Sequence, residues 1–231
     1  MNYHEITYSK EKALELSDFR DMDYHAVKHY NLPIELMMEN AGLHLASLIS
    51  KNADTQKVIK IGVGNGNNGG GGLVAARRLV AWGYEVYIDA FAEITKDLPL
   101  TQLDRALKYG AKLDNNVNPD VWVDAYLGFS QRLPLDTGLI SKIKEANLSS
   151  AFRVSLDVPT GYLGDTNTIR FEANTIISLA APKKILFDLP TSTELLVADL
   201  GIPNEVYKKF NANILPFQKG RILKLTRNGM D

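Results

Sequence analysis

Residues 58–72 read Val-Ile-Lys-Ile-Gly-Val-Gly-Asn-Gly-Asn-Asn-Gly-Gly-Gly-Gly, and the run Leu-Val-Ala-Ala-Arg-Arg-Leu-Val follows at residues 73–80. This order predicts a buried strand, then a loop of glycine and asparagine, then a helix. Glycine lets the backbone approach a ligand closely, and a helix N-terminus offers unpaired N–H groups and the positive end of a dipole. The stretch therefore predicts a site for a phosphate-bearing, nucleotide-like ligand.

Strands and helices alternate along the rest of the chain. The apolar patterns predict strands at 58–63, 85–92, 122–126, 152–158, 175–179 and 195–200, and helices at 9–30, 34–50, 72–82, 100–109 and 137–146. Alternation of this kind is typical of a mostly parallel sheet with helices on both faces. We expect an α/β protein with a Rossmann-like, three-layer α/β/α sandwich and an N-terminal helical extension.

The expected organisation is a single domain over residues 1–231. It comprises N-terminal helices at about 9–50, an α/β core at about 57–210 and a C-terminal tail at about 211–231. The tail is basic and polar from Lys219 to Asp231. Three interpretations remain open for it, namely a strand, an arm or a frayed end, and its composition favours a solvated tail.

Composition excludes several classes of function. The 231 residues are 45% hydrophobic and 23% charged, which is ample for a buried core, and a formal net charge of −1 gives no field that attracts nucleic acid or an anionic membrane. The chain has no cysteine, so disulfides, thiolate zinc sites and a cysteine nucleophile are excluded. No apolar stretch predicts a signal peptide or a membrane span, so we expect a cytoplasmic protein that binds neither nucleic acid nor a membrane.

Two aspartates are predicted to meet the glycine-rich loop. Asp124 and Asp157 lie at or near the ends of expected strands, and ligands of parallel sheets bind outside the carboxyl ends of the strands. Asp157 is the candidate acid–base residue, although it could instead cap the following turn or hold a ribose. Asp124 could likewise only cap its turn. A Rossmann oxidoreductase that uses Asp89 for a ribose is a weaker alternative.

Blocks of sequence in a fixed order resemble the YjeF N-terminal domain family. They are Met38–Gly42, Gly64–Gly70, Val123–Ser130, Ser155–Gly161, Ala181–Lys184 and Leu200–Pro203, and the segment from Asp23 to Pro33 matches a helix that ends at a proline turn. Typical members of this family are NAD(P)H-hydrate epimerases, related to the apolipoprotein A-I-binding protein. The resemblance covers about residues 9–210.

The resemblance implies a role in the repair of hydrated NADH and NADPH (NADHX and NADPHX). These damaged cofactors carry a hydroxyl at C6 of the nicotinamide ring, and family enzymes interconvert the R and S epimers. A stereospecific dehydratase, dependent on ADP or ATP, then restores the cofactor. Here we expect that dehydratase to be a separate protein, and family members are often homodimers.

The resemblance also implies site residues and a potassium ion. The substrate-binding residues would be Asn67, Asn68, Gly69, Gly70, Gly71, Gly128, Phe129, Ser130, Gln131, Arg132, Leu133, Pro134 and Asp157. Potassium would be held by Asn68, Asp124 and Thr160, which are oxygen donors suited to a hard cation.

The glycine-rich loop departs from the family pattern at position 71. The loop normally reads Asn-Asn-Gly-Gly-Asp-Gly, and this chain has Gly71 where the aspartate belongs. Glycine can neither hold a ribose hydroxyl nor carry a proton. The alternative function is therefore a nucleotide-binding or scaffolding module of the same fold with weakened or absent catalysis.

Overall fold

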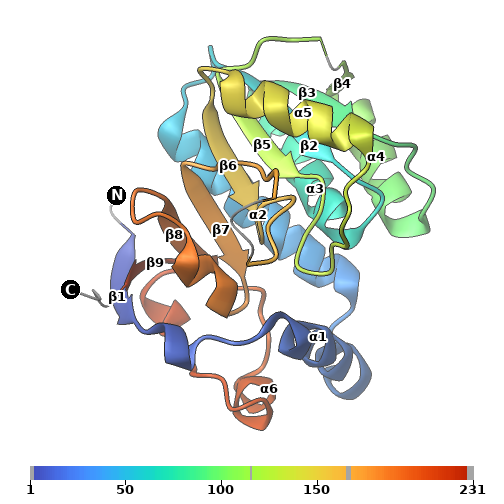
Figure 1. The fold of residues 1–231 in the computed structure, drawn as a ribbon. Coiled ribbons are helices and arrows are strands. Elements are labelled where there is room, and N and C mark those ends of the chain that lie inside the picture. The colour runs from blue at the N-terminus through green and yellow to red at the C-terminus, as the bar shows by residue number, and fades with distance from the viewer. Residues whose placement is uncertain (1–2, 115, 165–167, 228–231) are drawn as a thin grey trace.

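A twisted sheet of nine strands runs through the computed structural model, which describes residues 3–114, 116–164 and 168–227 (Figure 1). Its strands are β1 (His4–Tyr8), β2 (Val58–Val63), β3 (Glu85–Ala90), β4 (Lys112–Leu113), β5 (Val121–Ala125), β6 (Phe152–Leu156), β7 (Thr175–Leu179), β8 (Glu194–Ala198) and β9 (Ile222–Arg227). The α-helices are α1 (Leu16–Tyr30), α2 (Ile34–Asn52), α3 (Asn67–Ala81), α4 (Asp97–Tyr109), α5 (Thr137–Leu148) and α6 (Asn204–Lys209). Short 3₁₀ turns occupy Lys10–Lys12, Lys184–Asp188 and Phe217–Lys219.

The strand order creates a crevice at one edge of the sheet. The order is β1-β9-β8-β7-β6-β5-β2-β3-β4, and every neighbouring pair is parallel except β8 and β9. After β2 the chain adds β3 on one side, and it later returns to add β5 on the other side of β2. This reversal is a topological switch point, where the loops that leave the carboxyl ends of β2 and β5 separate and leave room for a ligand.

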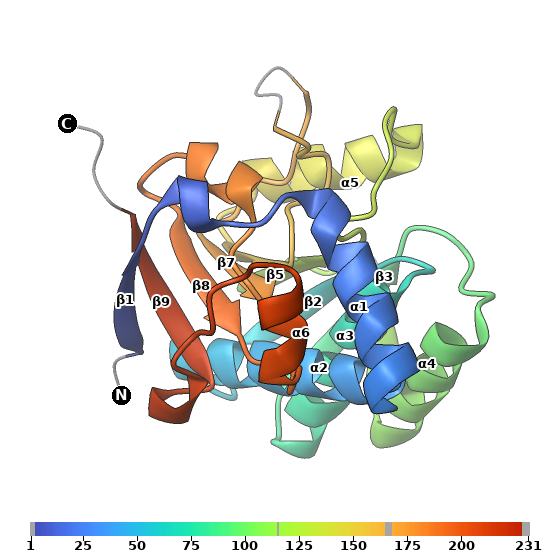
Figure 2. The ribbon, with the colours of Figure 1, turned by 90° about the horizontal axis from the view of Figure 1, so that it is seen from below.

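Helices cover both faces of the sheet. Figure 2 shows α5 on one side of the sheet and α2, α3 and α4 on the other, while α1 and α6 lie across the carboxyl ends of the strands. The core between the sheet and α2 and α3 is apolar and closely packed, with Leu45, Leu79 and Val123 fully buried. The predicted three-layer α/β sandwich is confirmed.

The main helix begins earlier than the sequence predicted. The expected helix was 72–82, but α3 starts at Asn67, so the asparagines and glycines form its first turns. Glycine disfavours a helix on its own. Here close packing requires it, because a Cβ on Gly69 would lie 2.0 Å from the carbonyl oxygen of Gly64, and one on Gly70 would lie 2.5 Å from the Met38 side chain.

Both ends of the described chain form strands, although no strand was predicted at residues 4–8 and the structure of the C-terminal tail was left open. Residues 4–8 form β1. The helix predicted at 9–30 was too long, because only residues 16–30 form α1. The tail is not simply solvated: β9 pairs with β1 in parallel and with β8 in antiparallel fashion. Leu223 and Leu225 bury their side chains against the sheet, which explains why a tail with basic residues is ordered as a strand.

Among the residues that the structure describes, no helix combines the length and the apolar character that a bilayer crossing requires.

Candidate functional site

A cavity of about 460 Å³ opens at the switch point, beyond the carboxyl ends of β2, β5 and β6. Eight of the predicted ligand-binding residues border it, namely Asn67, Asn68, Gly71, Gly128, Phe129, Ser130, Gln131 and Asp157. They come from the start of α3 and from the segments after β5 and β6, so the fold brings together residues that lie up to 90 positions apart in the sequence. The volume and the mixed polar and apolar wall suit a small organic ligand.

The other predicted residues lie behind or beside the cavity wall. Gly69 and Gly70 are buried in the packing of α3. Arg132, Leu133 and Pro134 are exposed and do not border the cavity. Asp124 and Thr160 are fully buried beneath the wall. The structure therefore divides the predicted set into residues of the wall, buried residues behind it, and an exposed segment, 132–134, outside the site.

The N-terminus of α3 points its polar groups at the cavity. Gly66 is the residue before the helix, and the first helical hydrogen bond runs from the N–H of Gly70 to the carbonyl of Gly66. The N–H groups of Asn67, Asn68 and Gly69 have no acceptor within the helix. These groups and the helix dipole favour a negatively charged ligand group at this end of the cavity.

Asp157 is held in a fixed position at the tip of β6. Its backbone adopts a φ of +74°, a left-handed conformation that is costly for a residue with a side chain. Its Oδ2 accepts a hydrogen bond from the N–H of Phe129 at 2.9 Å, and its Oδ1 lies 2.7 Å from the Nζ of Lys183. Two charged or polar partners therefore orient the carboxylate at the cavity wall.

Lys183 is almost completely buried, with 1% of its surface exposed. Its ammonium donates to the carbonyl of Leu179 at 3.0 Å and to the Oγ of Ser178 at 3.3 Å, and it lies 3.8 Å from the centre of the Phe19 ring. A buried cation needs such partners to offset its desolvation. Sequence reasoning did not link Lys183 with Asp157, because no spacing rule connects a residue after β6 with one after β7.

Behind the wall, Asp124 accepts several hydrogen bonds. Its donors are the N–H of Thr160 at 2.8 Å, the hydroxyl of Thr160 at 2.6 Å and the hydroxyl of Ser155 at 3.0 Å. Burial raises the pKa of Asp124 to about 6, although these hydrogen bonds act in the opposite direction. Asp124 therefore does more than cap its own turn, because it joins β5 to β6 and to the loop that follows β6.

Asn68 leaves one oxygen without a partner. Its Nδ2 donates to the carbonyls of Leu127 at 2.8 Å and Leu156 at 3.2 Å, whereas its buried Oδ1 has no hydrogen-bond partner. Leu127 also donates its N–H to the hydroxyl of Thr160 at 3.2 Å, so Asn68, Leu127 and Thr160 are linked. A buried acceptor without a partner lowers the stability of the fold unless it binds a cation or accepts a hydrogen bond from a ligand.

The three predicted potassium ligands are thus neighbours, and their oxygen atoms fit a hard cation. Within the described residues, no group of three or more histidines, aspartates or glutamates is arranged to hold a metal ion. This finding does not bear on Asn68, Asp124 and Thr160, because two of these three ligands belong to other residue types.

Position 71, where the family has aspartate, is a confined part of the wall. A Cβ at Gly71 would lie 3.2 Å from the Cδ2 of Leu156 and 3.6 Å from the Cβ of Ala41. The first of these distances is tighter than an ordinary van der Waals contact, so Leu156 would have to shift slightly to admit a side chain.

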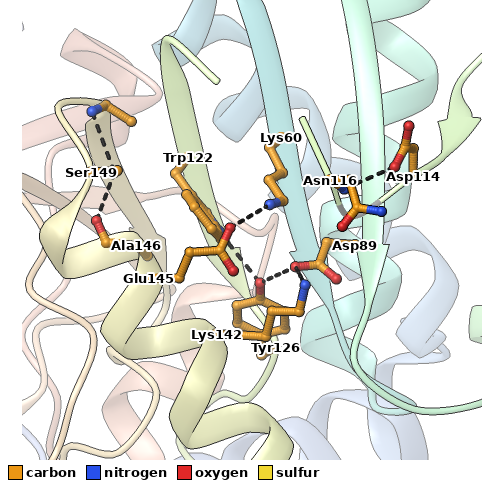
Figure 3. A network of polar contacts seen from close by, with 11 residues as sticks. Lys60, Asp89, Asp114, Asn116, Trp122, Tyr126, Lys142, Glu145, Ala146 and Ser149 are labelled. Atoms are coloured by element: carbon orange, nitrogen blue, oxygen red, sulfur yellow. Dashed lines mark hydrogen bonds and ion pairs between the residues drawn. The ribbon is translucent and has the colours of Figure 1, made fainter. Parts of the chain in front are cut away.

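Asp89 is not available to a ligand, contrary to the oxidoreductase interpretation. It is fully buried beside the cavity, and its Oδ2 accepts a hydrogen bond from the hydroxyl of Tyr126 at 2.8 Å (Figure 3). Lys142 lies 3.4 Å from the same oxygen. Burial and the Asp89 carboxylate raise the pKa of Tyr126, so the phenol stays protonated and donates. This network fixes the side chain of Tyr126, and Tyr126 is one of the residues that border the cavity.

Several wall residues were missed by sequence reasoning. They include Asp23 from α1, Met37 and Met38 from α2, Phe91 after β3, Lys96 before α4, and Tyr126. Asp23 heads a segment that the resemblance had singled out, so a signal for it existed. Met38 and Tyr126 also lie in blocks that the resemblance had singled out, whereas Met37 and Phe91 had no such signal, because side chains that line a cavity look like core residues in a sequence.

Together, the switch-point crevice, the helix N-terminus and the paired carboxylate define a doubly wound α/β protein with a nucleotide-sized site. The family described as "YjeF-related protein N-terminus" matches residues 34–185. The chain belongs to this family, which confirms the resemblance found in the sequence.

Individual relatives agree with this assignment. The chain is similar to the NAD(P)H-hydrate epimerase of Rhodopirellula baltica, with 34% identity over 83% of this chain and 85% of that protein. A relative of the same name in Dehalogenimonas lykanthroporepellens is 33% identical, and 90% of each chain is covered. The bifunctional NAD(P)H-hydrate repair enzyme Nnr of Thermofilum pendens is 29% identical over 85% of this chain, which spans 39% of that protein.

A solved structure has the same fold. The crystal structure of the yeast protein YNL200c superposes with a TM-score of 0.81, covering 93% of this chain and all of the yeast chain, at 23% sequence identity.

The Tyr126–Asp89 contact generates a prediction about stability. Tyr126→Phe removes the donor to a buried carboxylate, so we expect the free energy of unfolding to fall by about 1–3 kcal/mol. Tyr87→Phe is the matched control, because the hydroxyl of Tyr87 donates to the exposed Glu85 and its loss should change stability by less than about 0.5 kcal/mol. Urea unfolding of both variants measures the difference. Equal effects would show that the buried contact contributes nothing.

Proposed function

We propose that this protein interconverts the R and S epimers of hydrated NADH and NADPH at C6 of the nicotinamide ring. Its curated relatives named NAD(P)H-hydrate epimerase support this function, since they cover most of the chain. One observation carries the proposal in this chain: Asp157, held by Lys183 and the N–H of Phe129, borders the cavity next to the N-terminus of α3.

The chemistry at C6 requires a group that moves protons. C6 bears both a hydroxyl and the ring nitrogen, so the hydroxyl can leave and return, or the ring can open to an aldehyde and close again. Either route needs an acid–base group within hydrogen-bond reach of the hydroxyl, and such a group contributes a rate factor of roughly 10²–10⁴. We assign this role to Asp157. The N-terminus of α3 would hold the diphosphate of the ligand, so that the nicotinamide ring reaches Asp157.

The supporting oxygens are assigned to a cation. Asn68, Asp124 and Thr160 would hold a potassium ion, which the unpartnered Oδ1 of Asn68 and the buried Asp124 carboxylate both favour. A bound cation would supply positive charge behind the wall and fix the loops that follow β2, β5 and β6. The protein's own residues would continue to perform the proton transfer.

A second candidate function rests on Gly71. This chain lacks the family carboxylate at a position on the cavity wall, and the site there is too tight for a side chain without a shift of Leu156. A nucleotide-binding or scaffolding module without turnover would need no carboxylate at that position. Binding of an NAD-like ligand without epimerisation would favour this function.

We further propose the setting in which the enzyme works. A separate dehydratase dependent on ADP or ATP would consume one of the epimers, a division of labour that the bifunctional relatives combine in one chain. A cytoplasmic location fits a chain without cysteines. Association into a homodimer is part of the same proposal.

The central test replaces Asp157 and measures epimerisation. R-NADHX is mixed with the protein and a dehydratase specific for the S epimer, and recovery of NADH absorbance is followed. We expect Asp157→Asn to lower kcat by roughly 10²–10⁴-fold, because asparagine tolerates the left-handed backbone but carries no acid–base proton. Asp104→Asn on α4 is the matched control, since Asp104 is exposed and does not border the cavity.

Loss of Asp157 also leaves Lys183 without its counter-charge, which can unfold the protein. The double variant Asp157→Asn/Lys183→Met removes both charges and separates catalysis from folding. A folded double variant that turns over at the wild-type rate would refute the role of Asp157. A wild-type protein that never exceeds the spontaneous rate would refute the epimerase function itself.

The cation is tested by stability. Potassium that binds only the folded protein raises the unfolding temperature, by about 2–4 °C for each kcal/mol of binding free energy in a chain of this size. We expect potassium chloride to raise it relative to tetramethylammonium chloride at equal ionic strength, and Thr160→Val to abolish the rise. Identical unfolding temperatures of the wild type in the two salts would exclude the site.

A further inference from the structure

A second carboxylate borders the same cavity. We propose that Asp23 is a further catalytic residue, which exchanges a proton with the C6 hydroxyl while Asp157 exchanges one with the water that adds at C6. This inference rests on the proposed epimerase function and adds to it the residue that completes the proton path.

The backbone fixes α1 against the loop that carries Lys183. The N–H of Leu14 donates to the carbonyl of Pro182 at 3.1 Å, and the N–H of Lys184 donates to the carbonyl of Leu14 at 2.9 Å. These two bonds flank Lys183, so the chain that enters α1 is attached on both sides of the residue that holds Asp157. The position of α1 relative to the site is therefore set by hydrogen bonds as well as by apolar packing.

Asp23 lies on the face of α1 that looks toward the site. Phe19 is one turn earlier, and its ring lies 3.8 Å from the Nζ of Lys183, which is itself 2.7 Å from Asp157. Residues four apart share a helix face, so Asp23 continues the face of Phe19. Asp23 and Asp157 both border the cavity.

The surroundings of Asp23 let its carboxyl group keep its proton to a higher pH than an exposed aspartate does. Burial raises the pKa of Asp23 to about 6; the Asp157 carboxylate adds to this rise and the Lys183 ammonium opposes it. Tyr207 of α6 is the further titratable group that interacts with Asp23. None of the hydrogen bonds or ion pairs among the described residues engages the Asp23 side chain, so its proton is free to meet a ligand.

Two carboxyl groups in different environments form an acid–base pair. For the R epimer, Asp23 gives its proton to the C6 hydroxyl oxygen. The C6–O bond breaks, its electron pair leaves on the water that forms, and the lone pair of the ring nitrogen forms a nitrogen–carbon double bond. Water then adds to the other face, the double-bond pair returns to nitrogen, and Asp157 accepts the released proton.

The cycle closes without any other reactant. Substrate and product have the same composition, and one proton has moved from Asp23 to Asp157. Turnover of an S molecule moves the proton back, and exchange with solvent restores it between successive R molecules. Activity in both directions therefore requires one proton on the pair, and it declines as the pH rises above the pKa of Asp23.

The experiment compares Asp23→Asn, Asp23→Glu and the control Asp21→Asn, an exposed aspartate on the same helix. We expect Asp23→Asn to leave KM near the wild-type value, to lower kcat by roughly 10²–10⁴-fold and to abolish the decline of kcat above about pH 6. Asp23→Glu should restore part of kcat and the decline, and Asp21→Asn should match the wild type. In water enriched in ¹⁸O, each new S epimer should carry the label at C6.

Three results would overturn the proposal while the epimerase function stands. They are a wild-type kcat in Asp23→Asn, an unchanged pH profile in that variant, or product without label beyond spontaneous exchange. If Asp23→Asn does not fold, as judged by thermal unfolding, a wild-type kcat without a decline above about pH 6 would also refute it. An inactive wild type would instead refute the proposed function.

Discussion

The ion pair between Asp157 and Lys183 is the contact on which the rest of the site depends. A buried ammonium is costly, and here a carboxylate, a carbonyl, a hydroxyl and an aromatic face offset that cost. The partners lie in the segments that follow two neighbouring strands, since Asp157 comes directly after β6 and Lys183 comes after β7. Any change in the register of these strands would separate them. The pair therefore couples the geometry of the cavity to the integrity of the parallel sheet.

Close packing of the backbone positions the polar groups around this ion pair. The first turns of α3 can approach their neighbours only because three glycines have no side chains: Gly69 packs against the loop after β2, Gly70 against α2, and Gly72 against β2 and β5. That approach places Asn68 where it holds the carbonyls of Leu127 and Leu156, the residue just before Asp157. The placement of the polar groups thus depends on the close packing of the backbone. This requirement explains why the start of α3 is rich in glycine, a residue that disfavours helices.

Much of this could be predicted from the sequence. The alternation of apolar strands and helices predicted the three layers. The position of Asp157 at a strand end predicted that it lies near the glycine-rich loop. What the sequence could not provide came from tertiary packing. β1 and β9 are ordered because they pair with each other and with β8, and the start of α3 depends on contacts with Gly64 and Met38. The buried partners of Asp157 and Asp89 lie far from these aspartates in the sequence, so no local pattern predicts the contacts.

The most direct measurement is a crystal structure of the protein with NADHX bound. We expect the diphosphate at the N-terminus of α3 and the C6 oxygen within about 2.6–3.2 Å of a carboxylate oxygen of Asp157, with the Lys183 ion pair intact. A nicotinamide ring outside the cavity, or an Asp157 that contacts only the ribose, would contradict it.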